Sequence, residues 1–177
     1  MPRKERIHMT TILFNPLADN GRGRENLQKL TAKLDGQIAF VDITQADAVA
    51  VLERAQTADS VILTGGDGTL HRFVNTLGGR VPAHPVYYFP TGSGNDFWND
   101  IREAASVNGM ILLNPYLSGL PSVTVNGRTV RFLNGVGYGI DGYCCEEGDR
   151  LRASSGGRVN YTAIALSLIH ISEPTRP

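Results

Sequence analysis

Over about the first hundred residues, short apolar runs alternate with segments whose apolar residues recur at helical spacing. Between the first two runs, Leu27, Leu30 and Leu34 repeat at intervals that are typical of an amphipathic helix. Short apolar runs that end at turn-forming residues are typical of buried strands. The four runs that we interpret as strands cover residues 10–14, 37–43, 61–63 and 86–89.

This order of strand and helix with short connections predicts an α/β fold, with a parallel sheet covered by helices on both faces. Ligands of such sheets bind outside the carboxyl ends of the strands. We therefore expect the strand ends at Phe14, Leu63 and Phe89 to lie side by side, and the loops that follow them to converge. Thr44 is predicted to cap the helix after the second strand, with Asp47 in a capping-box position.

The pattern changes after about residue 113. The dipeptide Asn126-Gly127 is the strongest short hairpin signal, and β-branched segments flank it. An antiparallel hairpin after a run of parallel units indicates that a second, β-rich domain begins here. We expect an α/β domain over residues 1–115, the incomplete start of an antiparallel β-sandwich over residues 116–166, and a tail over residues 167–177.

Charge and cysteine content narrow the classes of function. Basic and acidic residues number 17 each, so no net field attracts nucleic acid, and we expect no nucleic-acid partner. The adjacent Cys144 and Cys145 are too close for ordinary disulfide geometry and have no partners at zinc-ligand spacing. Reduced thiols favour a cytoplasmic protein. No segment has the ~20 consecutive apolar residues that a membrane-spanning helix needs.

The segment Gly65-Gly66-Asp67-Gly68-Thr69 follows the third strand and precedes a helix. Its glycines let phosphate oxygens approach backbone N–H groups, and the helix directs its positive dipole end to the same place. Asp67 would repel phosphate unless it serves Mg²⁺ or a substrate hydroxyl, a combination that suits phosphoryl transfer. A simple tight turn, the alternative, needs only one glycine. We expect a side chain at Gly66 to obstruct nucleotide binding and leave the fold largely intact.

Two further loops have the same character. The loop over residues 90–97 contains three polar residues, of which Ser93 supplies a hydroxyl group. Asn95 and Asp96 are predicted to cap the helix that follows. Asn15 stands at the end of the first strand, ahead of two glycines and a helix. Each loop lies where a parallel sheet binds its ligand.

Together, Asn15-Pro16 with its two later glycines, the Gly-Gly-Asp-Gly-Thr segment and the Gly-x-Gly-Asn-Asp-Phe loop resemble the diacylglycerol kinase catalytic domain. That superfamily includes bacterial lipid kinases, sphingosine kinases and ceramide kinases. The match extends over residues 10 to about 100, and residues 134–142 resemble its later Gly-x-Gly-x-Asp segment. NAD kinases share the Gly-Gly-Asp-Gly core and 6-phosphofructokinases share it more loosely, but NAD kinases lack the Gly-x-Gly-Asn-Asp-Phe loop there. The resemblance implies a phosphofructokinase- or NAD-kinase-like nucleotide-binding domain followed by a β-rich lipid-binding domain.

Carried over position by position, the resemblance implies that Asp67 is catalytic and lies near the transferred phosphate and the lipid hydroxyl. Asp141 matches a position associated with the lipid head group in sphingosine kinases, and a turn before Gly142 is the alternative. Members of the family usually have Thr where this chain has Ser93, which keeps the hydroxyl. The implied nucleotide contacts are Asn15, Thr44, Gly65, Gly66, Asp67, Gly68, Thr69, Ser93, Asn95 and Asp96.

The resemblance also implies ATP and Mg²⁺ as cofactors and a lipid substrate at the membrane surface. The protein would then be cytoplasmic or peripheral at the membrane, and a homodimer is compatible with the sequence. The family's late Asp-Gly-Glu segment has no counterpart here, and residues 167–177 resemble translated adapter DNA rather than a native tail. We therefore expect a truncated lipid kinase that is itself inactive. The alternatives are a non-catalytic nucleotide-binding fragment and an NAD kinase.

Overall fold

The computed structural model describes residues 9–55, 59–92, 94–137 and 139–155, together with residues 160, 163, 164 and 166. The chain divides after Asn134 into two compact units. The expected tail over residues 167–177 lies outside the described residues.

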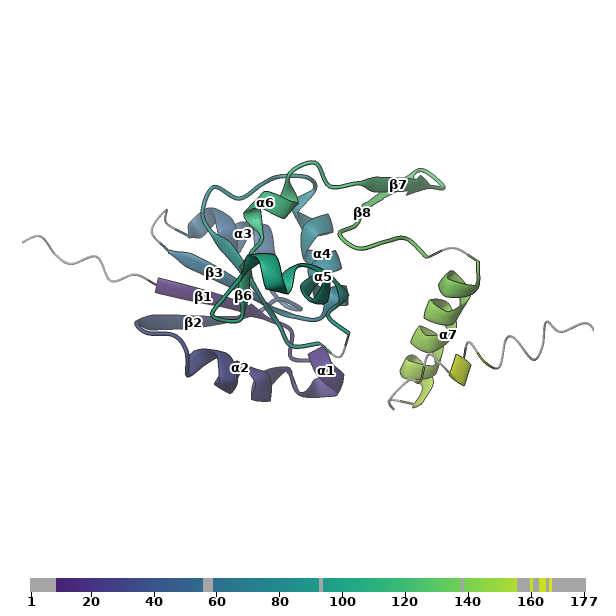
Figure 1. The fold of residues 1–177 in the computed structure, drawn as a ribbon, viewed down its shortest axis with the longest axis horizontal. Helices are drawn as coiled ribbons and strands as arrows, with labels where there is room; N and C mark the ends of the chain where they lie inside the picture. Colours follow the sequence, from purple (N-terminus) through teal and green to yellow (C-terminus); the bar gives the residue numbers. More distant parts are fainter. Residues whose placement is uncertain are drawn as a thin grey trace, which may run out of the picture. The chain divides into compact units, whose positions relative to one another are not determined.

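The first unit is built on a six-stranded sheet with the order β2-β1-β3-β4-β6-β5. Its strands are β1 (Met9–Phe14), β2 (Gln37–Asp42), β3 (Ser60–Gly65), β4 (Val86–Pro90), β5 (Ser106–Val107) and β6 (Met110–Leu112). The first four strands are parallel, and β6 and β5 continue the sheet antiparallel beyond β4. The prediction of an α/β fold with a largely parallel sheet is confirmed (Figure 1).

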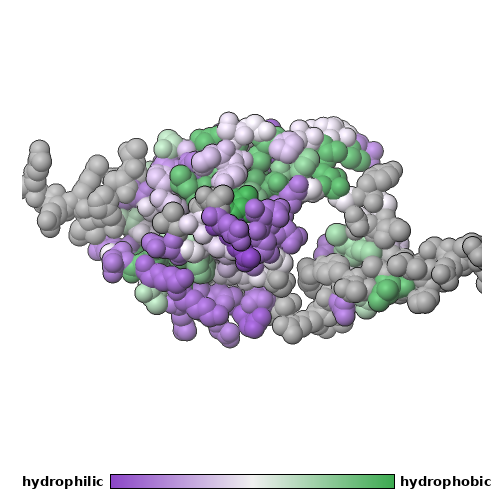
Figure 2. Space-filling model, in the orientation of Figure 1, coloured by the Kyte–Doolittle hydropathy of each residue, from purple (hydrophilic) through white to green (hydrophobic). Residues whose placement is uncertain are grey.

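Helices cover both faces of this sheet. They are α1 (Ala18–Gly21), α2 (Gly23–Thr31), α3 (Ala48–Arg54), α4 (Asp67–Leu77), α5 (Asp96–Ala105) and α6 (Asn114–Leu117). In Figure 1, α2 lies on one side of the sheet, while α3 and α4 lie on the other. Figure 2 shows hydrophilic residues gathered over α2 and over α5, the outward faces of two amphipathic helices. The apolar positions therefore face the sheet, as the helical spacing predicts.

Successive side chains along a strand point to opposite faces of the sheet, so the hydrophobic core has two parts, one on each face. Ile12 and Ile62 pack with Leu30 of α2 on one side. Leu13 and Leu63 pack with α3 and α4 on the other. Because β3 has neighbours on both edges and helices on both faces, its apolar run is buried throughout. This burial explains why its sequence does not alternate between apolar and polar residues.

The β5–β6 hairpin is an element that our reading of the sequence missed. Its turn residues, Asn108 and Gly109, have φ angles of 54° and 79°. Positive φ at both positions is what a two-residue hairpin turn of this kind requires, and Asn-Gly is the pair that tolerates it best. The signal was therefore present in the sequence between Val107 and Met110.

The predicted hairpin around Asn126-Gly127 is confirmed as β7 (Ser122–Val125) paired with β8 (Arg128–Arg131). It belongs to the first unit, which extends to Asn134. The side chain of Asn75 on α4 explains this, because it donates to the carbonyl of Arg131 and accepts from its N–H, both at 2.8 Å.

The described part of the second unit is mainly helical, with α7 spanning Ile140–Ser155. No strand occurs among the described residues after Arg131. The capping prediction for α3 is wrong. Asp47, not Thr44, is the N-cap, and its carboxylate accepts from the N–H of Val49. The Thr44 hydroxyl instead donates to Asp42 at 2.7 Å.

Candidate functional site

The three glycine-rich loops leave the sheet at one edge. In the strand register, Phe14 stands beside Thr64, and Thr64 stands beside Phe89. The loops after β1, β3 and β4 therefore start next to one another, and hydrogen bonds join each loop to another. The prediction that these strand ends lie side by side and that their loops converge is confirmed.

The loop after β1 meets the loop after β3 through Asn15. Its side-chain amide donates to the Thr69 hydroxyl at 3.1 Å, while its carbonyl oxygen accepts from the N–H of Leu17 at 2.9 Å. This contact lies between β1 and β3, where the strand order reverses. Parallel α/β sheets bind their ligands at such reversal points.

The loops after β3 and β4 touch through their backbones. The N–H of Thr91 donates to the carbonyl of Gly65 at 2.9 Å. A Cβ placed on Gly66 would lie 3.0 Å from Cα of Gly92. A side chain at Gly66 would thus press on the neighbouring backbone, and the expectation that it leaves the fold largely intact does not fit this packing. The close approach of the two loops is a sufficient reason for glycine at positions 66 and 92, so these two glycines are not evidence for a bound ligand.

Gly68 is different, because a Cβ placed there meets nothing within 4 Å. It lies in the first turn of α4, where the N–H groups of Asp67 and Gly68 have no hydrogen-bond partner among the described residues. Unpaired N–H groups at the positive end of a helix dipole attract anions. This first turn combines open space with free donors, as a phosphate site requires.

The carboxylate of Asp67 connects the two glycine-rich loops. It accepts the N–H of Asp96 at 3.1 Å and the N–H of Phe97 at 3.3 Å, so it caps α5 from another element. The predicted caps do not act as such: Asn95 is in the left-handed region at φ 59° and makes no side-chain cap bond. Its amide instead binds the N–H and carbonyl of Gly92. Because the N–H groups of Asp96 and Phe97 are bonded to Asp67, they are not free to bind a phosphate.

A buried phenol also fixes the backbone at the end of β3. The Tyr88 hydroxyl donates to the carbonyl of Gly65 at 3.0 Å. Burial raises the pKa of Tyr88 well above its ordinary value, and the nearby negative charge of Asp67 raises it further. The phenol therefore stays protonated and keeps its bond to the loop at neutral pH.

Other predicted site residues are not brought into these contacts. Thr44 lies beyond the end of β2, bonded to Asp42 and to Gln45. Asp96 is exposed in the first turn of α5, and only its backbone N–H meets Asp67. Ser93 lies outside the described residues. Asp141 lies in α7, in the second unit, and its side chain is likewise outside the description.

Reading the sequence missed three contacts at the site. The Asn26 amide of α2 reaches the carbonyl of Thr91 at 3.5 Å, and Tyr88 holds Gly65. The Asn134 amide donates to Asp67 at 3.5 Å. Asn134 begins the segment 134–142 that the family resemblance had singled out, so this signal was available. The other two residues carry no local mark of function.

The described residues contain neither a metal-binding cluster nor a membrane-spanning helix. The described residues include no group of three His, Cys, Asp or Glu side chains placed to hold a metal ion. No helix among them is long and apolar enough to cross a membrane.

The three loops lie within a segment that matches a known protein family. Residues 9–113, which contain all three loops, match the model of the diacylglycerol kinase catalytic domain. No curated protein matches the chain. A crystal structure from Bacillus anthracis str. Sterne, described provisionally as a diacylglycerol kinase, is 27% identical with a TM-score of 0.40, over 56% of this chain and 36% of that one.

A second structure from that organism, described as a diacylglycerol kinase, is 23% identical with a TM-score of 0.40, over 73% of this chain and 61% of that one. The chain thus spans less than two thirds of the length of either protein. The family match covers more than half of the chain. This chain belongs to the diacylglycerol kinase catalytic domain family.

Proposed function

We propose that this chain binds the phosphates of ATP at the first turn of α4 and forms the nucleotide-binding part of a lipid kinase. The observation that carries the proposal is the pair of unpaired N–H groups at Asp67 and Gly68, with open space in front of Gly68. They stand beside the strand-order reversal between β1 and β3, where the fold places its ligands.

Asp67 would fix the geometry of this site. Its bonds to α5 hold the loops after β3 and β4 in one arrangement, so the donors of α4 need little reorganisation when phosphate binds. Of the sequence-predicted contacts, Asn15 and Asn95 would act indirectly, because each fixes a loop backbone. Thr44, Ser93, Asp96 and Asp141 remain proposed contacts of the nucleotide or the lipid.

Mg²⁺ is compatible with these residues. Magnesium at nucleotide sites is usually held by one or two carboxylates together with phosphate oxygens. Oxygen Oδ2 of Asp67 accepts one N–H bond and therefore keeps lone-pair capacity for a cation. When bound there, Mg²⁺ would neutralise charge on the phosphates.

The proposed reaction moves the γ-phosphoryl group of ATP to a hydroxyl of diacylglycerol or a related lipid. The bond between the γ-phosphorus and its bridging oxygen breaks, a bond to the lipid oxygen forms, and ADP and the hydroxyl proton leave. Family membership supports the kinase class. The lipid acceptor is part of the proposal, and it would bring the protein to a membrane surface.

Gly68→Ala tests the phosphate site. The new methyl group meets no protein atom, and alanine is favoured over glycine in a helix by about 1 kcal/mol, so the variant should fold at least as stably. The same methyl group stands before the free N–H groups, so calorimetry should show Mg-ATP affinity reduced about tenfold or more. Thr76→Ala, at the exposed far end of α4, is the matched control and should bind normally.

Unchanged affinity in a well-folded Gly68→Ala would remove the first turn of α4 from the site. Radiolabelled transfer to diacylglycerol in mixed micelles, run in parallel with transfer to NAD, tests the reaction itself. Transfer to NAD alone would replace the lipid kinase with an NAD kinase. ATP binding with no transfer to either acceptor would support a nucleotide-binding part without activity of its own.

A further inference from the structure

The two edges of the six-stranded sheet differ in how they are protected. One edge is β5, which is only two residues long. The other edge is β2, whose six residues pair with β1 on one side and, among the described residues, with no strand on the other. Proteins protect edge strands by shortness, by lysine or proline, or by a β-bulge. β5 is short, whereas β2 contains no lysine or proline and pairs with β1 without a bulge.

The hydrogen bonds around β2 show which of its backbone groups point away from the sheet. The N–H of Ile43 donates to the carbonyl of Phe14 in β1 at 3.0 Å. Because backbone groups point to alternate edges along a strand, those of Ile38, Phe40 and Asp42 point outward. The carbonyl of Asp42 is already occupied, because it accepts two N–H groups from the turn that follows. Ile38 and Phe40 therefore offer two free N–H groups and two free carbonyl groups at this edge.

The side chains at this edge are apolar and partly uncovered. Phe40 is in register with Ile12, so its ring lies on the face of the sheet that α2 covers. Ile38 lies on the same face and packs beside α2, but Phe40 remains 51% exposed. Asp42, at the end of the strand, is the only charged residue of β2. A strand edge with these properties is prone to pair with another strand.

We propose that β2 pairs antiparallel with β2 of a second copy of this chain, across a two-fold axis at Ala39. Ile38 of each copy then lies opposite Phe40 of the other, and four hydrogen bonds use all the free groups of both residues. The two Ile–Phe pairs are of the aromatic and β-branched kind that stabilises antiparallel strands. A register centred on Phe40 would need the occupied carbonyl of Asp42. A register centred on Ile38 would need Gly36, which has a φ of 96° and is not extended.

The helices leave room for this pairing. Because α2 packs on β1, the α2 helices of the two copies would be at least three strand spacings apart, roughly 14 Å. A helix is about 10 Å wide, so space remains for the Phe40 rings. The contact is small, and we expect a dissociation constant on the order of 100 μM. The two-fold contact uses the long edge of each copy, so association stops at the dimer. The inference does not depend on the proposed kinase function.

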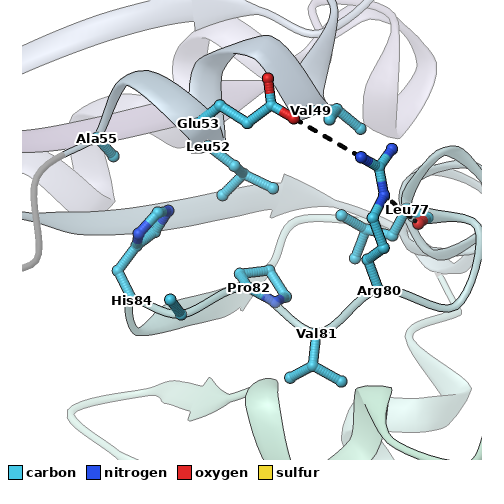
Figure 3. Close-up of a pocket in the computed structure, with 10 residues that line it drawn as sticks. Val49, Leu52, Glu53, Ala55, Leu77, Arg80, Val81, Pro82 and His84 are labelled. Carbon is cyan, nitrogen blue, oxygen red and sulfur yellow. Dashed lines mark hydrogen bonds and ion pairs between the residues drawn. The ribbon is translucent and has the colours of Figure 1, made fainter.

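A second exposed apolar surface provides a matched control. A cavity of about 420 Å³ lies between α3, the end of α4 and the loop before β4 (Figure 3). Val81 lines this cavity and is 46% exposed, close to the 51% of Phe40. No residue of β2 is among those that line it. Substitutions at Val81 therefore perturb a comparable apolar surface away from the proposed interface.

Sedimentation equilibrium of the 177-residue chain, over a concentration series that spans the expected constant, tests association. We expect monomer and dimer with no larger species. Phe40→Lys should weaken dimerisation about tenfold or more, because it places a charge opposite Ile38 of the other copy. Val81→Lys should dimerise like the wild type, and circular dichroism checks that both variants are folded. A monomeric wild type, larger assemblies, or equal weakening by both substitutions would refute the proposal.

Cysteine cross-linking tests the register, and it decides even if Phe40→Lys fails to fold. With Cys144 and Cys145 replaced by alanine, Ala39→Cys places two thiols at the axis, in a non-hydrogen-bonded pair with Cα atoms about 4.5 Å apart. Disulfides need about 4.4–6.8 Å. Phe40→Cys places the Cα atoms roughly 8 Å apart, because the two residues are offset by two positions. We expect mild oxidation to link Ala39→Cys about tenfold faster than Phe40→Cys or Val81→Cys. Equal rates, or faster linking through Phe40→Cys, would overturn the proposal.

Discussion

Replacing Asp67 tests whether one carboxylate joins the two glycine-rich loops. Asp67→Ala removes both acceptors from the N–H groups of Asp96 and Phe97. Asp67→Asn keeps the shape and one acceptor, and presents an NH₂ group to the other N–H. Asp96 is exposed, so water can replace its lost bond. Phe97 is 5% exposed, so its N–H loses a partner that water replaces poorly.

The size of the effect follows from these contacts. Loss of a helix N-cap costs about 0.5–2 kcal/mol, and a hydrogen bond to a charged group contributes about 1.5–3 kcal/mol. Because one of the two N–H groups can turn to water, we expect the free energy of unfolding to fall by about 2 kcal/mol in Asp67→Ala and about 1 kcal/mol in Asp67→Asn. For a chain of this length, the larger loss lowers Tm by about 4–8 °C.

The single tryptophan provides the assay. Trp98 lies in the first turn of α5, next to Phe97, so its fluorescence reports on the end of the helix that Asp67 caps. Urea unfolding followed by this signal gives the free energies. Asp100→Asn, an exposed carboxylate on the same helix, is the matched control and should change stability by less than about 0.5 kcal/mol. If Asp67→Ala unfolds at the same urea concentration as Asp100→Asn, the carboxylate does not hold the loops together.

Two further predictions concern the support of these loops. Tyr88 has a raised pKa when folded and an ordinary value of 10.0 when unfolded, so its contribution to stability is complete below about pH 10 and declines as the pH rises further. Unfolding free energies from about pH 8 to pH 11 should therefore decline less steeply in Tyr88→Phe than in the wild type or in the half-exposed Tyr143→Phe, and an equal decline would contradict this. Gly92→Ala should lose about 1–3 kcal/mol in thermal unfolding, because its Cβ would strike Gly66 and approach Asn95 Oδ1 to 2.9 Å. The exposed Gly94→Ala, whose nearest neighbour would be an Asp67 oxygen at 3.3 Å, should lose less, and the reverse order would show that the loops do not touch through their backbones.

Most of the secondary-structure elements and their order can be predicted from the sequence. Short apolar runs and helical spacing are local properties, so they placed the four parallel strands and most of the helices. Asn-Gly dipeptides are equally local signals, because the two residues are adjacent in the chain. Asn126-Gly127 predicts its hairpin, and Asn108-Gly109 carries the same signal. The family resemblance came from the same loops, because their residues are contiguous in the chain.

The order of the strands in the sheet and the contacts of each loop residue depend on the three-dimensional fold and cannot be predicted from local patterns. Nothing in the sequence of β1 states that it lies between β2 and β3, yet this order creates the reversal point beside Asn15. The sequence predicts that Asp67 serves a metal ion or a substrate, but its carboxylate caps a helix 29 residues further along the chain. The glycines looked alike in sequence. Packing separates them, because Gly66 faces the backbone of Gly92 and Gly68 faces open space. A glycine in the sequence shows only that no side chain is present at that position. Whether a distant backbone or a ligand requires its absence depends on which of them the fold brings against the glycine.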